Sequence, residues 1–397
     1  MLQIDKKTGL LISDYYFSTP IHRTVVRTFV IRAICLNLIM SGQPHNSGIF
    51  YLALSVLLLC SGPVSAQLEV LHVRQVDTIE TTLDLFGEAA PMNITLTFDI
   101  KKYQREKFKG EYMPVHFRYQ LNDTLHLDKE MRLKARGSFR RNHCSLAPFW
   151  LDVRKTDQEN EDSAGFHRIK IVTHCKGSQA YNEYVLKEYL CYKIYNLITP
   201  VSFRVRLVRM TYVDTGRKNK PTEGWAFMIE PQEMLAKRLE AVEVQRDDLS
   251  TSLLRPWEMD ILAVFQYMIG NVDYSIYGGQ NIKFLGLPGF GSAGYSPVPY
   301  DFDYTGFVDT YYAIPSEFTG INSVRDRYYL GPCREEGAYE AAIEHINRLR
   351  EEIFRLVEDF EYLDQKHKLK VLDYLEEYFE SSERPKSLIS SFQRTCI

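Results

Sequence analysis

The sequence predicts an α+β protein in which a β-rich amino-terminal lobe with one helix precedes a mainly helical carboxyl-terminal lobe. Apolar and polar residues alternate in short runs between 91 and 172, which is the pattern of half-buried strands. Apolar side chains then recur at helical spacing over 180–197. Late in the chain, a long apolar stripe over 343–360 indicates packed helices.

The strand-like runs of the first lobe are separated by polar or glycine-containing breaks. Neighbouring short strands with such breaks are typical of an antiparallel sheet. The runs before the helix read MNITLTFDI, MPVHFRYQL, HLDKEMRLKARG, FWLDVR and FHRIKIVT. The helix at 180–197 ends before Pro200, and two more strands are expected at 202–214 and 224–230. We place this lobe at 67–230.

The second lobe, 231–397, follows the last of these strands. Its first helices are expected in QEMLAKRLEAV and PWEMDILAVFQYMIG, where apolar residues recur at helical spacing. Residues 271–303 are rich in turn formers and hold two short strands. The remainder is strongly helical, with a second apolar stripe in LKVLDYLEEYF.

Residues 1–66 have the character of a targeting segment. The apolar run 49–60 is shorter than the roughly 20 residues that a membrane-spanning helix needs, and it suits the core of a secretory signal. Small residues precede a cleavage site after Ala66, and Met40 would start a more ordinary signal. We therefore predict an exported protein of the periplasm, cell surface or extracellular space. The alternative is an anchor helix that stays in place.

The charge balance gives no reason to expect nucleic-acid binding. The chain is 25% charged and 45% hydrophobic, which excludes a disordered protein, and its net charge is -3. Residues 1–66 contribute +3, so the remaining chain carries -6. This acidity disfavours a polyanionic partner. No transmembrane helix is expected in the mature chain.

Five cysteines remain after residue 66, so at least one thiol has no intramolecular partner. Cys191 lies in an apolar helical pattern and is expected to be a buried core thiol. The pairing of the other four stays open. Export would permit disulfides.

Four polar residues after the apolar helix 256–270 carry the chemistry of the second lobe. Asp273 lies just past that helix, and Asn281 opens a strand-like run. Asp301 and Asp303 follow another apolar run. Phosphoryl transfer needs a carboxylate that orients the attacking hydroxyl, together with oxygen ligands for Mg²⁺. We assign the first role to Asp273 and the metal ligands to Asn281, Asp301 and Asp303. Two capped turns around a hairpin would explain the same residues without catalysis.

Several segments resemble the CotH-type kinases, a family with the two-lobe protein-kinase-like fold. The matching segments are Arg136-Gly137-Ser138, PFWLDVRK, the helix at 180–197, WAFMIEP, and the Asp273, Asn281 and Asp301 positions. The resemblance covers roughly 91–380 and is motif-specific only over 271–303. It implies a protein-kinase-like fold and transfer of phosphate from ATP, with Mg²⁺ or Mn²⁺, to Ser or Thr of a protein. Envelope or surface proteins are the implied partners.

The resemblance also implies residues that hold the nucleotide. Lys170, on a strand before the helix, or Lys176, at the helix start, would neutralise phosphates, and Arg136 could clamp them instead. Glu188 would pair with the lysine. Glu183 is also available on this helix, but the two glutamates cannot both face the site, because five residues turn a helix by about 140°. Glu230, in the segment 228–231, would lie at the adenine edge.

Three other interpretations stay open. The fold could serve as a noncatalytic envelope scaffold that only binds partners. Asp301 and Asp303 also form a D-x-D pattern, which metal-dependent glycosyl- or nucleotidyl-transferases use, although no βαβ pattern precedes it. Tyrosines cluster over 304–329 and could form a stacking surface, although a packed core with polar tips explains them equally well.

Overall fold

The structure is a computed structural model that describes residues 3–4, 11–12, 74–75, 85–87, 90–120, 125–153, 168–217, 220–244, 249–286 and 294–397. The chain divides into two compact units, Met1–Val70 and Leu71–Ile397. In the first unit, the described residues form the antiparallel pair β1 (Gln3–Ile4) and β2 (Leu11–Ile12). The predicted apolar run 49–60, Met40 and the cleavage site after Ala66 lie outside the described residues.

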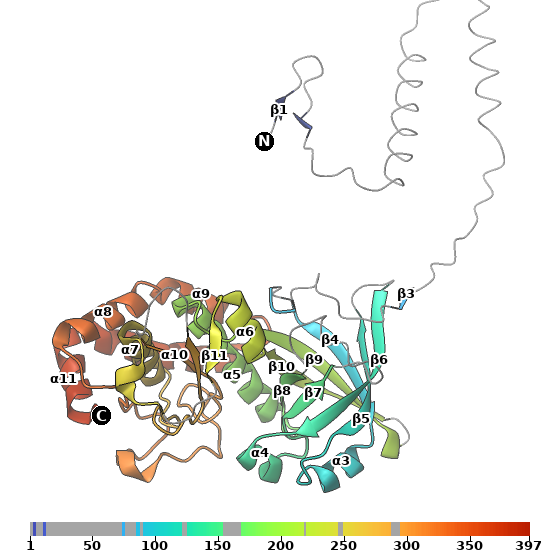
Figure 1. The fold of residues 1–397 in the computed structure, drawn as a ribbon. Coiled ribbons are helices and arrows are strands. Elements are labelled where there is room, and N and C mark those ends of the chain that lie inside the picture. The colour runs from blue at the N-terminus through green and yellow to red at the C-terminus, as the bar shows by residue number, and fades with distance from the viewer. Residues whose placement is uncertain are drawn as a thin grey trace, which may run out of the picture. The chain divides into compact units, whose positions relative to one another are not determined.

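The second unit contains a β-sheet of seven strands that closes into a barrel (Figure 1). Along the sheet the order is β6-β5-β4-β9-β10-β8-β7, and β7 pairs back onto β6. Only the β4–β9 pair is parallel within this ring. The strands are β4 (Met92–Phe98), β5 (Met113–Gln120), β6 (Leu125–Ala135), β7 (Phe149–Asp152), β8 (Arg168–Thr173), β9 (Val205–Asp214) and β10 (Lys220–Ile229). A short β3 (Arg74–Gln75) adds to β6 in parallel.

Alternation along the strands explains the interior of this closed sheet. Inward positions of β4, such as Ile94 and Leu96, are buried while their neighbours are more exposed. One hydrophobic cluster collects side chains from all seven strands, including Leu133, Phe149 and Met228. The period-two pattern in the sequence therefore marks the residues that fill the barrel.

The predicted protein-kinase-like two-lobe fold is wrong, although the α+β composition is correct. The finding that overturns it is the closure of the sheet. β6 is long enough to pair with β5 over 126–133 and with β7 over 132–135, so the seven strands leave no free edge. The predicted single helix of this region is also incomplete. The described part of 90–230 has three helices, α3 (Ile100–Glu106), α4 (Ser138–His143) and α5 (Gln179–Ile198).

Helix α5 connects the closed sheet to the helical part of the unit. It contacts β9, β10 and α9 (Arg350–Glu358), and most of its side chains are buried. A second hydrophobic cluster joins it to the later helices. Those helices are α6 (Gln232–Arg238), α7 (Pro256–Met268), α8 (Glu336–Asn347), α10 (Gln365–Ser382) and α11 (Pro385–Thr395). A second sheet holds β11 (Val242–Val244), β12 (Ile282–Gly286) and β13 (Ser296–Pro299).

Two disulfides link distant segments of this unit, Cys144–Cys175 and Cys333–Cys396. Cys191 is a free, buried thiol on α5, as the apolar pattern around it predicts. Within the described ranges, no helix has the length and apolar character needed to cross a membrane.

Candidate functional site

A hairpin brings together the polar residues that follow α7. β12 and β13 are antiparallel, with Ile282 opposite Pro299. Asn281 precedes β12 and Asp301 follows β13, so the two residues lie at the same end of the hairpin. The Tyr300 backbone N–H donates to the Asn281 carbonyl at 2.9 Å, which fixes this end. Asn281 and Asp301 both have positive φ, 55° and 67°, conformations that recur at functional sites.

Asp273 is held against Asn281. The Asn281 side-chain amide donates to the Asp273 carbonyl at 2.7 Å and to its Oδ2 at 3.1 Å, while Gln280 donates to Oδ1. Burial raises the pKa of Asp273 to about 6, and the carboxylates of Asp301 and Asp303 add to this rise. Asp273 is partly exposed. It therefore combines a fixed orientation with a pKa near neutral pH, as a general base requires.

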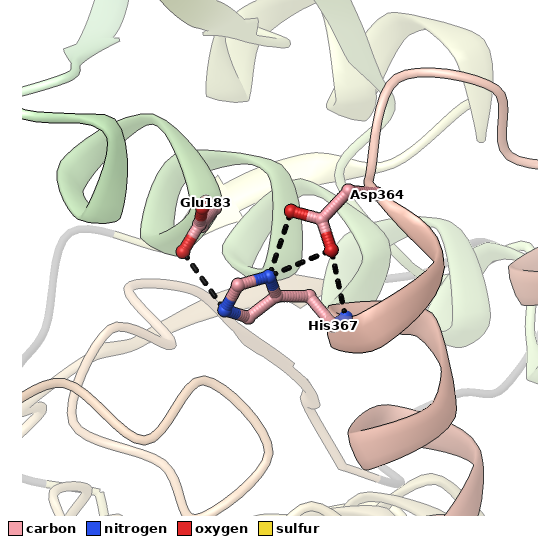
Figure 2. A group of neighbouring side chains, drawn as sticks. All are labelled: Glu183, Asp364 and His367. Carbon is pink, nitrogen blue, oxygen red and sulfur yellow. Dashed lines mark hydrogen bonds and ion pairs between the residues drawn. The ribbon is translucent and has the colours of Figure 1, made fainter.

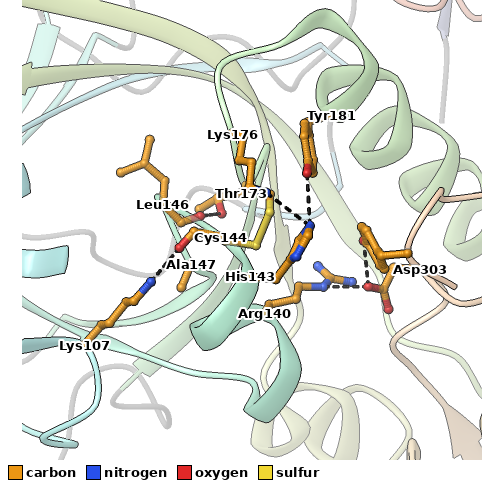
Figure 3. Close-up of a disulfide and its surroundings, with 12 residues drawn as sticks. Lys107, Arg140, His143, Cys144, Leu146, Ala147, Thr173, Lys176, Tyr181 and Asp303 are labelled. Carbon is orange, nitrogen blue, oxygen red and sulfur yellow. Dashed lines mark hydrogen bonds and ion pairs between the residues drawn. A yellow bond between two sulfur atoms is a disulfide. The ribbon is translucent and has the colours of Figure 1, made fainter. Parts of the chain in front are cut away.

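Arg140 on α4 binds three carboxylates from two other segments. Its Nε donates to Asp303 Oδ2 at 2.8 Å, and its terminal nitrogen lies 2.9 Å from Glu188 and 3.0 Å from Asp301. Tyr312 donates to the same Asp303 oxygen at 2.9 Å. Figure 3 shows the Arg140–Asp303 contact beside the Cys144–Cys175 disulfide. We call Glu188, Asp273, Asp301 and Asp303 the acidic group.

The acidic group carries more negative charge than Arg140 neutralises. Burial raises the pKa of Glu188 and of Asp303, although Arg140 opposes both shifts. The Glu188 Oε1 atom is buried and has no hydrogen-bond partner among the described residues. Three carboxylates bind one guanidinium and Asp273 lies near two of them, so the acidic group leaves room for a further cation or for protons.

Three cations lie near one another around Lys170, which is also near Asp301. Lys170 on β8 lies 4.4 Å from the Tyr300 ring centroid and 5.4 Å from that of Trp150. Burial lowers the pKa of Lys170 to about 7, and the nearby charges of Arg136 and Lys283 lower it further, while the carboxylates of Asp301 and Glu233 oppose them. No carboxylate of the described residues is within ion-pair distance of these three side chains. We call Arg136, Lys170 and Lys283 the basic group.

The other predicted nucleotide-binding residues lie elsewhere. The Lys176 ammonium is 3.4 Å from His143 Nε2 and lies over the Tyr181 ring, outside the basic group. Glu230 is fully buried between Arg204 and Arg238, at 3.0 Å from each. Its carboxylate is therefore part of a buried structural ion pair and is not accessible to a ligand.

Glu183 faces away from the acidic group and bonds His367 on α10. The His367 Nε2 atom is 2.9 Å from Glu183, and its Nδ1 atom is 2.8 Å from Asp364 (Figure 2). These three side chains could hold a metal ion by position alone. Because both ring nitrogens already contact carboxylates, the triad links α5 to α10 through its own hydrogen bonds.

Aromatic rings lie beside the acidic group. The His143 ring centroid is 5.2 Å from that of Tyr312 and 5.3 Å from that of Phe139. Tyr311 is 62% exposed and bonds the Tyr181 hydroxyl at 2.7 Å. The tyrosines that the sequence singled out at 304–329 thus divide between this exposed group and the core, where Tyr329 is buried.

Sequence reasoning missed Arg140 and Lys283. Arg140 and Arg141 are adjacent, and no pattern in the sequence distinguishes the buried one. Lys283 belongs to a strand-like run in which it alternates with apolar residues, a signal that it shares with many exposed lysines. No known protein-family model matches the chain, and no curated protein matches it. The resemblance to CotH-type kinases stays a prediction from the residues.

Proposed function

We propose that this protein is a metal-dependent phosphotransferase that moves phosphate from a nucleoside triphosphate, with ATP as the expected donor, to a hydroxyl group of a protein. The observation that carries the proposal is that an excess of carboxylates and a set of cations without ion-pair partners lie near each other in two distinct groups of described residues. The acidic group holds an excess of carboxylates, and the basic group holds three cations that have no ion-pair partner within the described ranges. A metal ion bound to phosphates has the matching charges, positive toward the acids and negative toward the lysines.

The oxygen atoms present fit Mg²⁺ or Mn²⁺. The Asn281 amide nitrogen is used by Asp273, which leaves its Oδ1 atom available, and Asp301 binds Arg140 through Oδ1, which leaves Oδ2. Asp303 shares its Oδ2 between Arg140 and Tyr312. Bound Mg²⁺ would neutralise charge on the phosphate oxygens. Asn281 and Asp301 are its expected ligands in this chain, and Asp303 positions Arg140.

The basic group suits phosphates by charge and by surroundings. Lys170 is half-buried among aromatic rings, where an isolated ammonium is poorly solvated. An anion between Lys170, Arg136 and Lys283 would remove the repulsion among them. Arg136 adds a planar guanidinium that can bind two phosphate oxygens at once.

Asp273 would act on the acceptor. Hydrogen bonds from Gln280 and Asn281 fix its carboxylate. Because its pKa is about 6, the carboxylate is mostly deprotonated at neutral pH. It can therefore accept the proton of an acceptor hydroxyl as that oxygen attacks phosphorus. We propose Ser or Thr of envelope or surface proteins as acceptors, in keeping with the secretory pattern of residues 1–66. Two disulfides also favour an oxidising compartment.

The test is to incubate the purified chain with γ-labelled ATP, Mg²⁺ or Mn²⁺ and a generic acceptor protein. Label on the acceptor with the wild type, and none with Asp273→Asn, would support the proposal. Absence of transfer together with absence of a nucleotide-induced change in melting temperature would reject it.

A noncatalytic scaffold is the second candidate, and the position of Arg140 favours it. Its guanidinium already occupies one oxygen each of Asp301, Asp303 and Glu188, so part of the acidic group is neutralised without a metal. A chain that binds Mg-ATP with unchanged affinity after Asp301→Asn, and transfers nothing, would favour this function.

A further inference from the structure

The Cys144–Cys175 disulfide lies at the end of the helix that carries Arg140. α4 spans only Ser138–His143, and Cys144 is its C-terminal cap. Arg140 is the one buried residue of this helix. Figure 3 shows the helix, the disulfide and the Arg140–Asp303 contact within one view.

Helix α4 has little stability of its own. Six residues are far fewer than the roughly 12–15 that an isolated helix needs to be even marginally stable. Its N-terminal cap is Gly137, which makes no side-chain capping bond and has a φ of 80°. The position of α4 must therefore come from contacts beyond the helix.

Those contacts converge on the two cysteines. The Leu146 backbone N–H donates to the Cys175 carbonyl at 3.0 Å, and Lys107 donates to the Cys144 carbonyl at 2.7 Å. Thr173 donates to the Leu146 carbonyl. The segment after α4 is thus joined to the connection between β8 and α5, and the disulfide is the covalent member of this junction.

The backbone of Cys175 is in an unfavourable conformation, which the contacts of this junction maintain. Its φ is 59°, in the left-handed region that residues other than glycine seldom adopt. Once the covalent bond is absent, Cys175 can relax to an extended conformation, and the Leu146 pairing loses its alignment. Greater motion of Cys144 would then displace Arg140, which lies one helical turn earlier.

We propose that the Cys144–Cys175 disulfide positions Arg140 and that the acidic group is assembled only in the oxidised chain. The catalytic consequence rests on the proposed phosphotransferase function, but the structural claim does not. When the bond forms, the two thiols lose two protons and two electrons to a disulfide oxidant, which leaves as two thiols. The phosphotransferase would then be silent in a reducing compartment and competent after folding in an oxidising one.

Burial of the Cys144–Cys175 disulfide determines when its redox state can change. Cys144 is 1% exposed and Cys175 is 5% exposed, so a reductant cannot reach the bond in the folded chain. The redox state is therefore set while the protein folds. We expect dithiothreitol added to the folded protein to leave the bond intact, as alkylation and mass spectrometry would report.

The test compares two double variants of the full chain. Cys144→Ser with Cys175→Ser removes the proposed positioning bond. Cys333→Ser with Cys396→Ser is the matched control, because that bond joins the loop before α8 to the carboxyl terminus. Hydrogen exchange is measured at 138–144 and 301–305, and Mn²⁺ affinity is measured at pH 7 by titration calorimetry.

We expect the first variant alone to lose protection at least tenfold in both segments and to bind Mn²⁺ at least fivefold more weakly. Wild-type protection and wild-type Mn²⁺ affinity in that variant would overturn the proposal. If it does not fold, the wild type is reduced with dithiothreitol in mild urea, which opens the junction that shields the bond, and is measured while its far-ultraviolet circular dichroism stays native. The exchange measurement is independent of catalysis, so a wild type without transferase activity would reject the proposed function alone.

Discussion

The Arg140 Nε atom donates a 2.8 Å hydrogen bond to Asp303, which lies 163 positions later in the sequence. The same guanidinium binds Asp301 and Glu188, so one short helix joins the closed sheet, α5 and the 301–303 segment. Removing a member of a buried charge network leaves uncompensated charge, which is costly in a poorly solvated interior.

Arg140→Gln should therefore lower the free energy of unfolding by about 3 kcal/mol, because three carboxylates would face one another without a cation. Arg141→Gln is the matched control. Among the described residues, the Arg141 side chain bonds the Gly137 carbonyl alone, and it is partly exposed, so its loss should stay within about 0.5 kcal/mol. Urea unfolding at pH 7 measures both. Equal stabilities of the two variants would show that Arg140 does not hold the acidic group together.

Lys170→Met should stabilise the protein and abolish nucleotide binding. Lys170 has its pKa lowered to about 7 by burial and by its cationic neighbours, so its charged form is disfavoured in the folded state. The resulting penalty is complete below pH 7 and disappears as the pH rises to the unfolded pKa of about 10.4. We expect a gain of about 1–2 kcal/mol at pH 7 and a flatter rise of stability between pH 7 and 10.

The check on Lys170→Met is urea unfolding at several pH values, with melting temperatures recorded with and without Mg-ATP. Lys220→Met, at an exposed strand position, controls for the loss of a lysine. A variant that is less stable than the wild type and still responds to Mg-ATP would refute a phosphate-binding role for Lys170.

Asp273→Asn should reduce the transfer rate by about 10²–10⁴ and leave the apparent affinity for Mg-ATP nearly unchanged. The amide keeps the shape of the side chain but cannot accept the hydroxyl proton. Glu317→Gln removes an exposed carboxylate outside the acidic group and should have no effect. Steady-state kinetics separate kcat from KM, and a change confined to KM would contradict the role of a base.

The pH profile should follow the same carboxylate. Because burial and its acidic neighbours raise the pKa of Asp273 to about 6, kcat/KM should fall as the pH drops below 6. The loss at low pH follows from protonation of the base. A profile measured from pH 4.5 to 8 that is flat across 6 would assign the base to another group.

The sequence predicted the individual helices and strands better than it predicted which strands pair with one another. Strand-like and helical runs follow from periodicity, and the β12–β13 hairpin places Asn281 beside Asp301 because neighbouring strands bring their ends together. Closure of the sheet depends on the β6–β7 pairing, which periodicity does not encode. The kinase-like fold therefore proved wrong, even though Asp273, Asn281, Asp301 and Lys170 lie near one another.

Arg140 could not be predicted for a related reason. It lies on a short helix whose placement comes from a disulfide and from contacts between distant segments. Composition around it, with Arg141 adjacent, favours a solvated pair of arginines equally well. Burial of one of them depends on the tertiary fold.

In the proposed function, the acidic and basic groups form one site for a metal–phosphate pair. The most direct test is calorimetric titration of the purified chain with ATP, with and without Mg²⁺, in the wild type, Asp301→Asn and Lys170→Met. We expect Mg²⁺-dependent binding in the wild type, loss of the Mg²⁺ dependence in Asp301→Asn, and loss of binding in Lys170→Met. Binding of equal strength in all three proteins, or no binding to the wild type, would contradict the claim.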